Sequence, residues 1–309
     1  MNRRLFALSL CSLSLAACMS KPPVTPGATT PVPPVAKPRE PVIAVALGGG
    51  GAKGFAHIGV LKMLESHGIK PRIVTGTSAG SFVGAIYASG RSPYQLQEVA
   101  LALEEADIRD LTFSKQGFLE GQKLQDYVNR QIGNRLIQQL PLRFAAVATQ
   151  LDTGAKVAFN RGNTGQAVRA SCSIPNVFIP ATINGKRYVD GGLVSPVPVS
   201  TARDMGADLV IAVDITARPK PGQATSLWGL LDQSLNIMGM QGLAQELAQA
   251  DVVIKPAVGG MGVAELSGRH QAILEGERAA QAQLKAIDAA IARFKASPAA
   301  LRPAPTPKI

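Results

Sequence analysis

Ile73-Val74-Thr75-Gly76-Thr77-Ser78-Ala79-Gly80 is the stretch that decides the fold. An apolar run ends in a serine between glycines, and a helical pattern follows, so the stretch predicts a strand, a tight turn and a helix. A serine on such a turn adopts a strained backbone that exposes its hydroxyl. Side chains at Gly76 and Gly80 would collide with the neighbouring strand and helix. The pattern therefore predicts that Ser78 is a nucleophile.

A glycine-rich loop precedes this turn. The apolar run 42–47 is typical of a buried parallel strand, and it leads into Gly48-Gly49-Gly50-Gly51-Ala52-Lys53-Gly54. Such a loop leaves backbone N–H groups uncovered, and these groups bind anions. Two nucleotide motifs are incomplete here, because the next strand does not end in a carboxylate and Lys53 is not followed by Ser or Thr. We expect the loop to supply the oxyanion hole for Ser78.

An aspartate on a glycine turn lies downstream. Arg187-Tyr188-Val189-Asp190-Gly191-Gly192 predicts a short strand that ends at Asp190. Taken alone, the Asp-Gly-Gly sequence is also typical of a hairpin turn.

Together, the loop 49–54, the serine turn 76–80 and the turn 190–192 resemble the patatin-like phospholipase family. The segment Arg169-Ala170-Ser171-Cys172-Ser173-Ile174-Pro175, with Phe178, is similar to the family's segment ahead of its catalytic aspartate. The likeness covers roughly Pro41 to Ala257. One position departs from the pattern, since many members carry aspartate in place of Gly48, which removes a bracing side chain but no catalytic group.

The resemblance implies a three-layer α/β fold with a mostly parallel sheet and helices on both faces. It implies a Ser–Asp dyad without histidine, in which Ser78 is the nucleophile and Asp190 accepts its proton. No cofactor and no metal are implied. The oxyanion donors would be Gly49, Gly50 and Gly51, and the remaining motif residues are Lys53, Gly54, Gly76, Gly80, Gly191 and Gly192.

The implied substrates are lipid acyl esters, cleaved as by a phospholipase A or a lysophospholipase. Two alternatives stay open. The same dyad serves a transacylase or a general esterase, which differ in whether an alcohol or water takes the acyl group. A surface lipoprotein with a vestigial site is the alternative outside enzymes.

Other polar residues have weaker patterns. His270 follows Asp190 in the order of a Ser-Asp-His triad, but its surroundings are polar. His57 and His67 lie on the helix after the glycine loop, and Asp214 ends an apolar strand as a second-choice acid. Ser171 and Ser173 lack the strand–turn–helix context, so neither is expected to be the nucleophile.

The chain divides into segments by composition. Residues 1–17 resemble a bacterial lipoprotein signal peptide, and Leu15-Ala16-Ala17-Cys18 matches the lipobox, which implies acylation of Cys18 with palmitate-like chains. Residues 18–41 form a Pro-rich tether, 42–296 the hydrolase domain and 297–309 a disordered tail. Within the domain, 91–140 is mainly helical and amphipathic and is expected to cover the site.

Charge and anchor together indicate a location. The formal net charge of the 309 residues is +11. No nucleic-acid motif accompanies it, so an anionic membrane surface is the better partner than nucleic acid. We expect a bacterial cell-envelope protein that is held by its lipid anchor, with the outer membrane as the preferred destination. The lipid substrate is the expected small partner.

Overall fold

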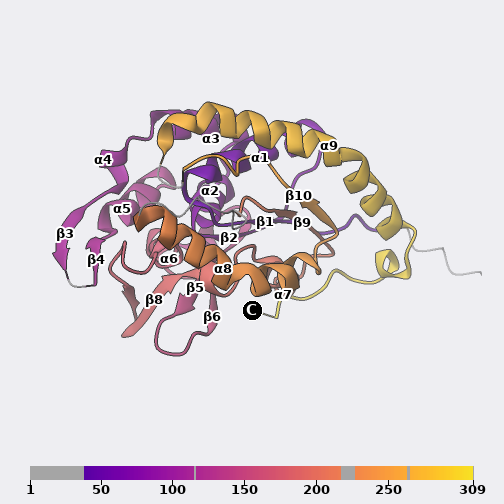
Figure 1. Ribbon diagram of the computed structural model, residues 1–309. Helices are drawn as coiled ribbons and strands as arrows, with labels where there is room; N and C mark the ends of the chain where they lie inside the picture. Colours follow the sequence, from indigo (N-terminus) through magenta and orange to yellow (C-terminus); the bar gives the residue numbers. More distant parts are fainter. Residues whose placement is uncertain (1–37, 115, 217–226, 263–264, 309) are drawn as a thin grey trace, which may run out of the picture. The chain divides into compact units, whose positions relative to one another are not determined.

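Five parallel strands build the centre of the sheet in the computed structural model, which describes residues 38–114, 116–216, 227–262 and 265–308 (Figure 1). The chain divides after Ala36 into two units, and the described residues belong to the second. The expected mostly parallel sheet is confirmed. Across the sheet the parallel strands are ordered β10 (Val252–Ile254), β9 (Leu209–Val213), β1 (Ile43–Leu47), β2 (Ile73–Thr77) and β5 (Arg143–Gln150).

Three antiparallel strands extend the sheet beyond β5. Both β6 (Lys156–Phe159) and β8 (Lys186–Asp190) pair antiparallel with β5, and β7 (Ala181–Ile183) pairs antiparallel with β8. The register of these strands positions the two candidate catalytic residues. Thr77, the residue before Ser78, pairs with Val147 of β5, and the next residue of β5, Ala148, pairs with Asp190. Because β6 occupies the other edge of β5 over these residues, β2 and β8 lie end to end along one edge, which brings Ser78 close to Asp190.

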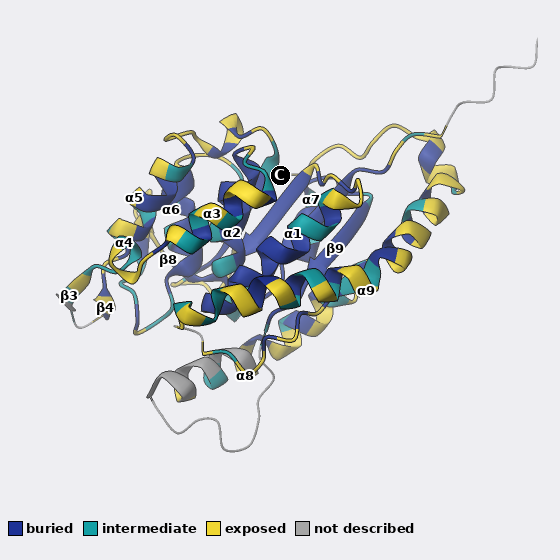
Figure 2. Cartoon of the chain, turned by 90° about the horizontal axis from the view of Figure 1, so that it is seen from above, coloured by how far each residue is buried: buried dark blue, intermediate teal, exposed yellow. Residues whose placement is uncertain are grey.

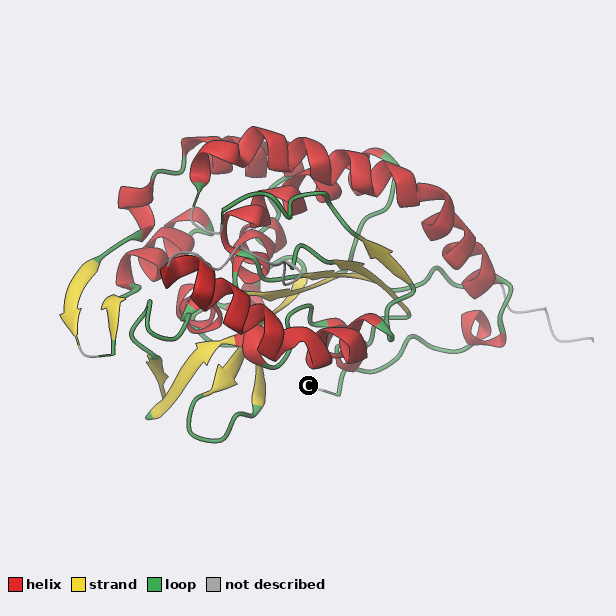
Figure 3. Cartoon of the chain, in the orientation of Figure 1, coloured by secondary structure: helices red, strands yellow, loops and turns green. Residues whose placement is uncertain are grey.

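Helices cover both faces of the sheet because its strands are apolar on both faces (Figure 3). Ile43, Val45 and Leu47 of β1 face one core with α1 (Ala56–Ser66), α2 (Ala79–Ala88) and α9 (Arg269–Lys295). Ala44 and Ala46 face the other core with α7 (Val199–Asp204) and α8 (Leu227–Leu247). Figure 2 shows the strands and the inner helix faces as buried. Among the described residues, no helix combines the length and the apolar character that crossing a membrane requires.

The backbones of α1 and α9 touch directly. A Cβ added at Gly59 would collide with the carbonyl oxygen of Ile273, and one added at Gly276 would collide with that of Ala56. Because α1 follows the glycine loop, this contact fixes the base of the loop against the C-terminal helix. The two glycines allow an approach that any side chain would prevent.

The segment 91–140 is helical over much of its length, as expected. Its helices are α3 (Pro93–Ala102), α4 (Glu105–Ile108) and α5 (Gln122–Gln131). The predicted apolar residues Leu96, Leu103 and Leu124 are buried and line the pocket described below, so the segment covers the site. One part was not expected, namely a two-stranded sheet of β3 (Leu111–Ser114) and β4 (Gly117–Leu119).

The two ends of the domain contact each other, and both predicted boundaries shift. The Arg39 side chain forms an ion pair with Asp208 at 2.6 Å, and the backbone N–H of Arg39 donates to the Ala300 carbonyl at 3.0 Å. Arg39 therefore belongs to the domain and not to the tether. The predicted disordered tail from Ser297 is wrong for the described residues, because Ala300 is buried and the Lys308 N–H donates to the Asp204 carbonyl at 2.7 Å.

Candidate active site

Ser78 lies on a sharp turn between β2 and α2. Its backbone has φ 52° and ψ −123°, a left-handed conformation that side chains other than glycine rarely adopt. The expected collisions are confirmed at both flanking glycines. A Cβ at Gly76 would collide with the Gly80 backbone, and a Cβ at Gly80 would collide with the Leu47 carbonyl. Because Gly76 and Gly80 have no side chains, β2 and α2 can pack with their backbones in contact, and this close packing holds Ser78 in its strained conformation.

A second serine holds this turn in place. The Ser171 hydroxyl accepts a hydrogen bond from the Ser78 N–H at 2.9 Å and donates one to the Val147 carbonyl at 2.6 Å. Ser171 is fully buried on α6 (Thr164–Cys172). It bridges the strained turn to the neighbouring strand. Sequence reasoning missed this role, which becomes visible only when α6 is packed beside β5.

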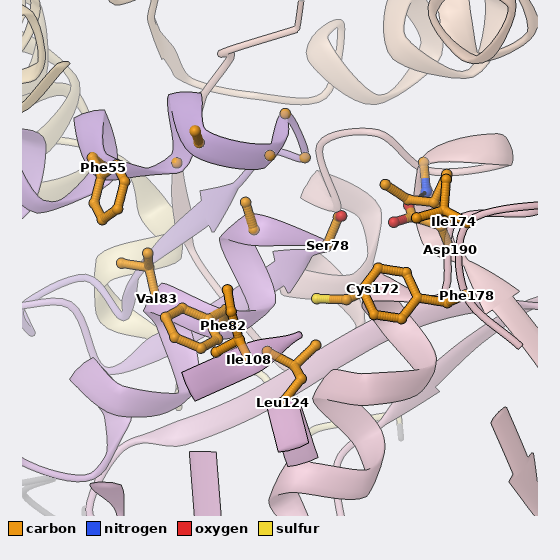
Figure 4. Close-up of a pocket in the computed structure, with 18 of the residues that line it drawn as sticks. Phe55, Ser78, Phe82, Val83, Ile108, Leu124, Cys172, Ile174, Phe178 and Asp190 are labelled. Carbon is orange, nitrogen blue, oxygen red and sulfur yellow. Dashed lines mark hydrogen bonds between the residues drawn. The ribbon is translucent and has the colours of Figure 1, made fainter. Parts of the chain in front are cut away.

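Asp190 ends β8 at the same edge of the sheet. Its Oδ1 accepts a hydrogen bond from the Gly192 N–H at 2.7 Å, and its own N–H donates to the Ser173 carbonyl at 2.8 Å. Gly191 is needed for this turn, because a Cβ there would collide with the Val147 carbonyl. The carboxyl is therefore held rigidly, and Figure 4 shows the Ser78 hydroxyl pointing toward it.

The Asp190 carboxyl is poised to bind a proton. It is 5% exposed, and burial raises its pKa to about 6, although the nearby Ser78 hydroxyl and the Gly192 N–H oppose that rise. Ser78 is near enough to affect the pKa, yet the two groups do not meet the geometry of a full hydrogen bond. Oδ2 has no hydrogen-bond partner among the described residues. One oxygen of a buried carboxylate is thus left free beside the serine.

The glycine loop runs directly beside Ser78. A Cβ at Gly49 would lie 3.3 Å from the Ser78 Cβ. The Gly49 N–H is engaged, since it donates to the Pro196 carbonyl at 3.0 Å, and this removes Gly49 from the expected donors. The N–H groups of Gly50 and Gly51 have no acceptor within the described part of the chain, and both residues line the pocket. They are two free donors at the pocket.

The remaining loop residues are closely packed. The Lys53 side chain is 2% exposed, so it is not a solvated loop residue. Gly54 lets the loop pack on α2, because a Cβ added at Gly54 would lie only 2.7 Å from the Ala79 Cβ. At Gly48 a Cβ would be 2.9 Å from both the Val213 carbonyl and a Val197 methyl group. An aspartate at position 48, which many family members carry, would therefore not fit in this chain.

None of the three histidines lines the pocket. The ring Nε2 of buried His57 lies 2.8 Å from the Gly48 carbonyl, and burial lowers its pKa to about 4, so the neutral ring donates to that carbonyl. His57 therefore braces the glycine loop. His67 contacts Asp288 at 3.1 Å, and His270 is exposed at the start of α9.

The other candidate acid is also accounted for. Asp214 is buried, and its Oδ1 accepts hydrogen bonds from the Thr216 N–H at 3.0 Å and the Thr216 hydroxyl at 2.5 Å. Its Oδ2 lies 3.2 Å from Lys255 Nζ. These contacts assign it to the turn after β9. Within the described residues, no group of three His, Cys, Asp or Glu side chains has the arrangement of a metal site.

A mostly apolar pocket of about 670 Å³ opens onto Ser78 and Asp190. Figure 4 shows Phe82, Leu124, Cys172 and Phe178 around it. Burial raises the pKa of the Cys172 thiol, so this side chain is an uncharged part of the wall. The pocket can exclude water from an acyl chain and leave the ester at the serine.

A family model for patatin-like phospholipase matches residues 45–203, which is more than half of the chain. The chain belongs to the patatin-like phospholipase family. All motif residues from Gly49 to Gly192 lie inside the matched range. Curated relatives agree with this assignment. An uncharacterized NTE family protein of Mycobacterium tuberculosis is 37% identical over 197 residues, and patatin-like phospholipase domain-containing protein 6 of Homo sapiens is 34% identical over 207 residues.

These matches cover only part of each relative. They span 61% and 63% of this patatin-like chain, but 54% of the mycobacterial protein and 15% of the human one. Two solved structures were also found. VipD from Legionella pneumophila has a TM-score of 0.47, 13% identity and coverage of 82% of this chain and 68% of its own. ExoU, in its complex with SpcU from Pseudomonas aeruginosa, has a TM-score of 0.45, 16% identity and coverage of 82% and 53%.

Proposed function

We propose that this protein is a serine acyl hydrolase that cleaves lipid acyl esters through a Ser78–Asp190 dyad. The observation that carries the proposal is the free Oδ2 of buried Asp190 beside the strained Ser78 turn. A serine hydroxyl needs a base within reach to become a nucleophile. With a pKa of about 6, the Asp190 carboxylate is ionised at neutral pH and still accepts a proton readily.

The reaction follows from this arrangement. Ser78 Oγ attacks the ester carbonyl while its proton passes to Asp190 Oδ2, and the N–H groups of Gly50 and Gly51 stabilise the oxyanion. Each such donor contributes about 3–4 kcal/mol in the transition state. The proton then passes from Asp190 to the leaving alcohol, which leaves the acyl group on Ser78. Asp190 next takes a proton from water as the oxygen of that water attacks the acyl carbonyl, and it passes the proton to Ser78 Oγ when the bond to the fatty acid breaks.

The pocket suits an acyl chain. Its volume of about 670 Å³ and its mostly apolar lining surround a chain whose ester lies at Ser78. We therefore propose activity of the phospholipase A or lysophospholipase type.

The proposed location is the bacterial cell envelope. Cys18 lies outside the described residues, so the anchor is supported by the lipobox alone. We propose that acylated Cys18 holds the domain at a membrane, with the outer membrane as the destination.

Hydrolysis by single variants tests the dyad. Ser78→Ala and Asp190→Asn should each lower turnover of monoacyl phosphatidylcholine by about 10³-fold or more, and the double variant should be no worse, because the two groups act as one unit. Asp152→Asn, an exposed carboxylate outside the pocket, and His270→Ala are the controls and should retain activity. A folded His270→Ala protein as inactive as Ser78→Ala would replace the dyad with a triad.

Two further readouts separate the alternatives. A fluorophosphonate probe should label wild type and not Ser78→Ala, and failure to label wild type would identify a vestigial site. Acyl transfer to an added alcohol in preference to water would identify a transacylase. The value of kcat/KM should rise as pH increases through about 6, since only ionised Asp190 acts as the base.

A further inference from the structure

The hairpin of β3 and β4 presents two large apolar side chains to solvent at the pocket. Leu111 is 87% exposed and Phe118 is 59% exposed, yet both line the pocket. The hairpin is not loosely placed. The N–H groups of Phe118 and Leu119 donate to the Val177 carbonyl at 2.9 Å, and the Ile179 N–H donates to the Leu119 carbonyl at 2.9 Å. The backbone of β4 is therefore fixed, and the exposed Phe118 side chain keeps its place at the pocket.

Helix α8 carries a matching apolar stripe. Leu230, Ile237 and Met240 are spaced by seven and three residues, so they share one face of the helix, and all three are exposed. Met240 also lines the pocket. The stripe therefore begins at the pocket and continues outward along α8, while Leu243 on the inner side packs in the core.

The charge around this rim is not positive. Residues 98–126, which contain the hairpin, include seven acidic and three basic residues, a net charge of −4. The sequence of α8 contains two acidic residues and no lysine or arginine. The positive charge of the chain thus lies elsewhere. A partner that binds here buries apolar surface. Negative charge on the partner would gain little from the rim, because the rim is itself not positive.

We propose that the β3–β4 hairpin and the outer stripe of α8 form a docking surface for a phospholipid bilayer, which they enter by apolar insertion and without a requirement for anionic lipid. The inference rests on the proposed function in one respect, namely that the pocket takes an acyl chain. Leu111, Phe118 and Met240 belong to both the pocket wall and the exposed rim. A chain that leaves the bilayer between them stays in apolar surroundings, whereas a protein seated there would close the entrance.

Fluorescence quenching by brominated lipid tests the insertion. The single Trp of the chain is replaced in Trp228→Phe, and a reporter is introduced by Phe118→Trp, all in a Ser78→Ala background so that no hydrolysis is needed. Vesicles of brominated phosphatidylcholine should quench the reporter and shift its emission to the blue. The matched control is Tyr94→Trp, an aromatic position that is 62% exposed but does not line the pocket, and it should not be quenched.

The contribution of the rim is measured in the same assay. Leu111→Ser and Ile237→Ser, each added to the reporter protein and checked by circular dichroism, should each weaken vesicle binding by about tenfold. Raising NaCl from 0.1 to 1 M, or adding anionic lipid, should change the apparent affinity by less than twofold.

Several results would overturn the inference. These are equal quenching at positions 94 and 118, quenching that requires anionic lipid or disappears in high salt, and a blue shift that grows with protein concentration without vesicles. The last result would identify a second copy of the chain as the occupant. Quenching of the reporter in a protein whose Ser78 form proves inactive would preserve the docking surface and reject the proposed function.

Discussion

Replacing Asp190 by asparagine is expected to stabilise the fold while it abolishes activity. Burial raises the Asp190 pKa from its ordinary 3.8 to about 6. At 1.36 kcal/mol per pKa unit, a rise of about two units corresponds to about 3 kcal/mol. This is the free energy that the folded protein loses when the carboxyl must ionise in its buried position. Asparagine keeps the shape and does not ionise.

The size of the effect depends on pH. Below pH 3.8 the carboxyl is protonated in both the folded and the unfolded state, so its contribution to stability is fully present. As pH rises toward 6, the unfolded chain releases the proton and the folded protein retains it, so the free energy of unfolding of wild type falls. Above about pH 6 the loss is complete. The advantage of Asp190→Asn should therefore appear between pH 4 and 6 and reach about 3 kcal/mol at pH 8.

Urea unfolding followed by circular dichroism measures this advantage. The difference in unfolding free energy between Asp190→Asn and wild type is determined at pH 4, 6 and 8. The matched control is Asp152→Asn, whose exposed carboxylate pairs with Arg187; loss of an exposed ion pair costs about 0–1 kcal/mol, well below the change expected at position 190. An Asp190→Asn difference that does not change with pH would show that Asp190 is not desolvated, and would refute the explanation of its raised pKa.

Three other changes have defined outcomes. Gly80→Ala should destabilise the protein by more than about 3 kcal/mol in urea unfolding, because its methyl group would meet the Leu47 carbonyl; wild-type stability would mean that the turn relaxes freely. His57→Leu removes the hydrogen bond to the Gly48 carbonyl and should lower turnover about tenfold without moving the pH profile; a shifted profile would give His57 a role in proton transfer. Cys18→Ser should abolish lipid modification in a mass measurement, and an unchanged lipid-modified mass would disprove the anchor.

The centre of the site was predictable from sequence because its pattern is local. Gly76 and Gly80 flank Ser78 within five residues, and the collision at Gly76 involves only the backbone of the same turn, although the collision at Gly80 is with the Leu47 carbonyl of β1. The parallel strands were predictable for a similar reason, since a strand buried on both faces must be apolar along its whole length. Asp190 required the family resemblance, because an Asp-Gly-Gly turn alone has several explanations.

Features that depend on distant packing were missed. Ser171 supports Ser78 only because α6 lies beside β5, and Gly49 loses its free N–H only because the chain at Pro196 returns to the loop. Neither contact has a sequence pattern. The β3–β4 hairpin was missed because its strands are three and four residues long and carry exposed apolar residues, which obscure the alternation that marks a half-buried strand.

The part of the chain that matches the family model is shorter than the part that β1 needs in order to fold. The family match ends at residue 203, but β1 is hydrogen-bonded along its full length to β9, which starts at Leu209. A chain shortened to the matched residues would expose one edge of β1, a row of unpaired N–H and C=O groups that can pair with other chains. The residues that match the family model therefore do not form a unit that would fold alone. Any transplant or truncation of this site has to keep β9 and the α9 helix that packs on α1, although neither contributes a proposed catalytic residue.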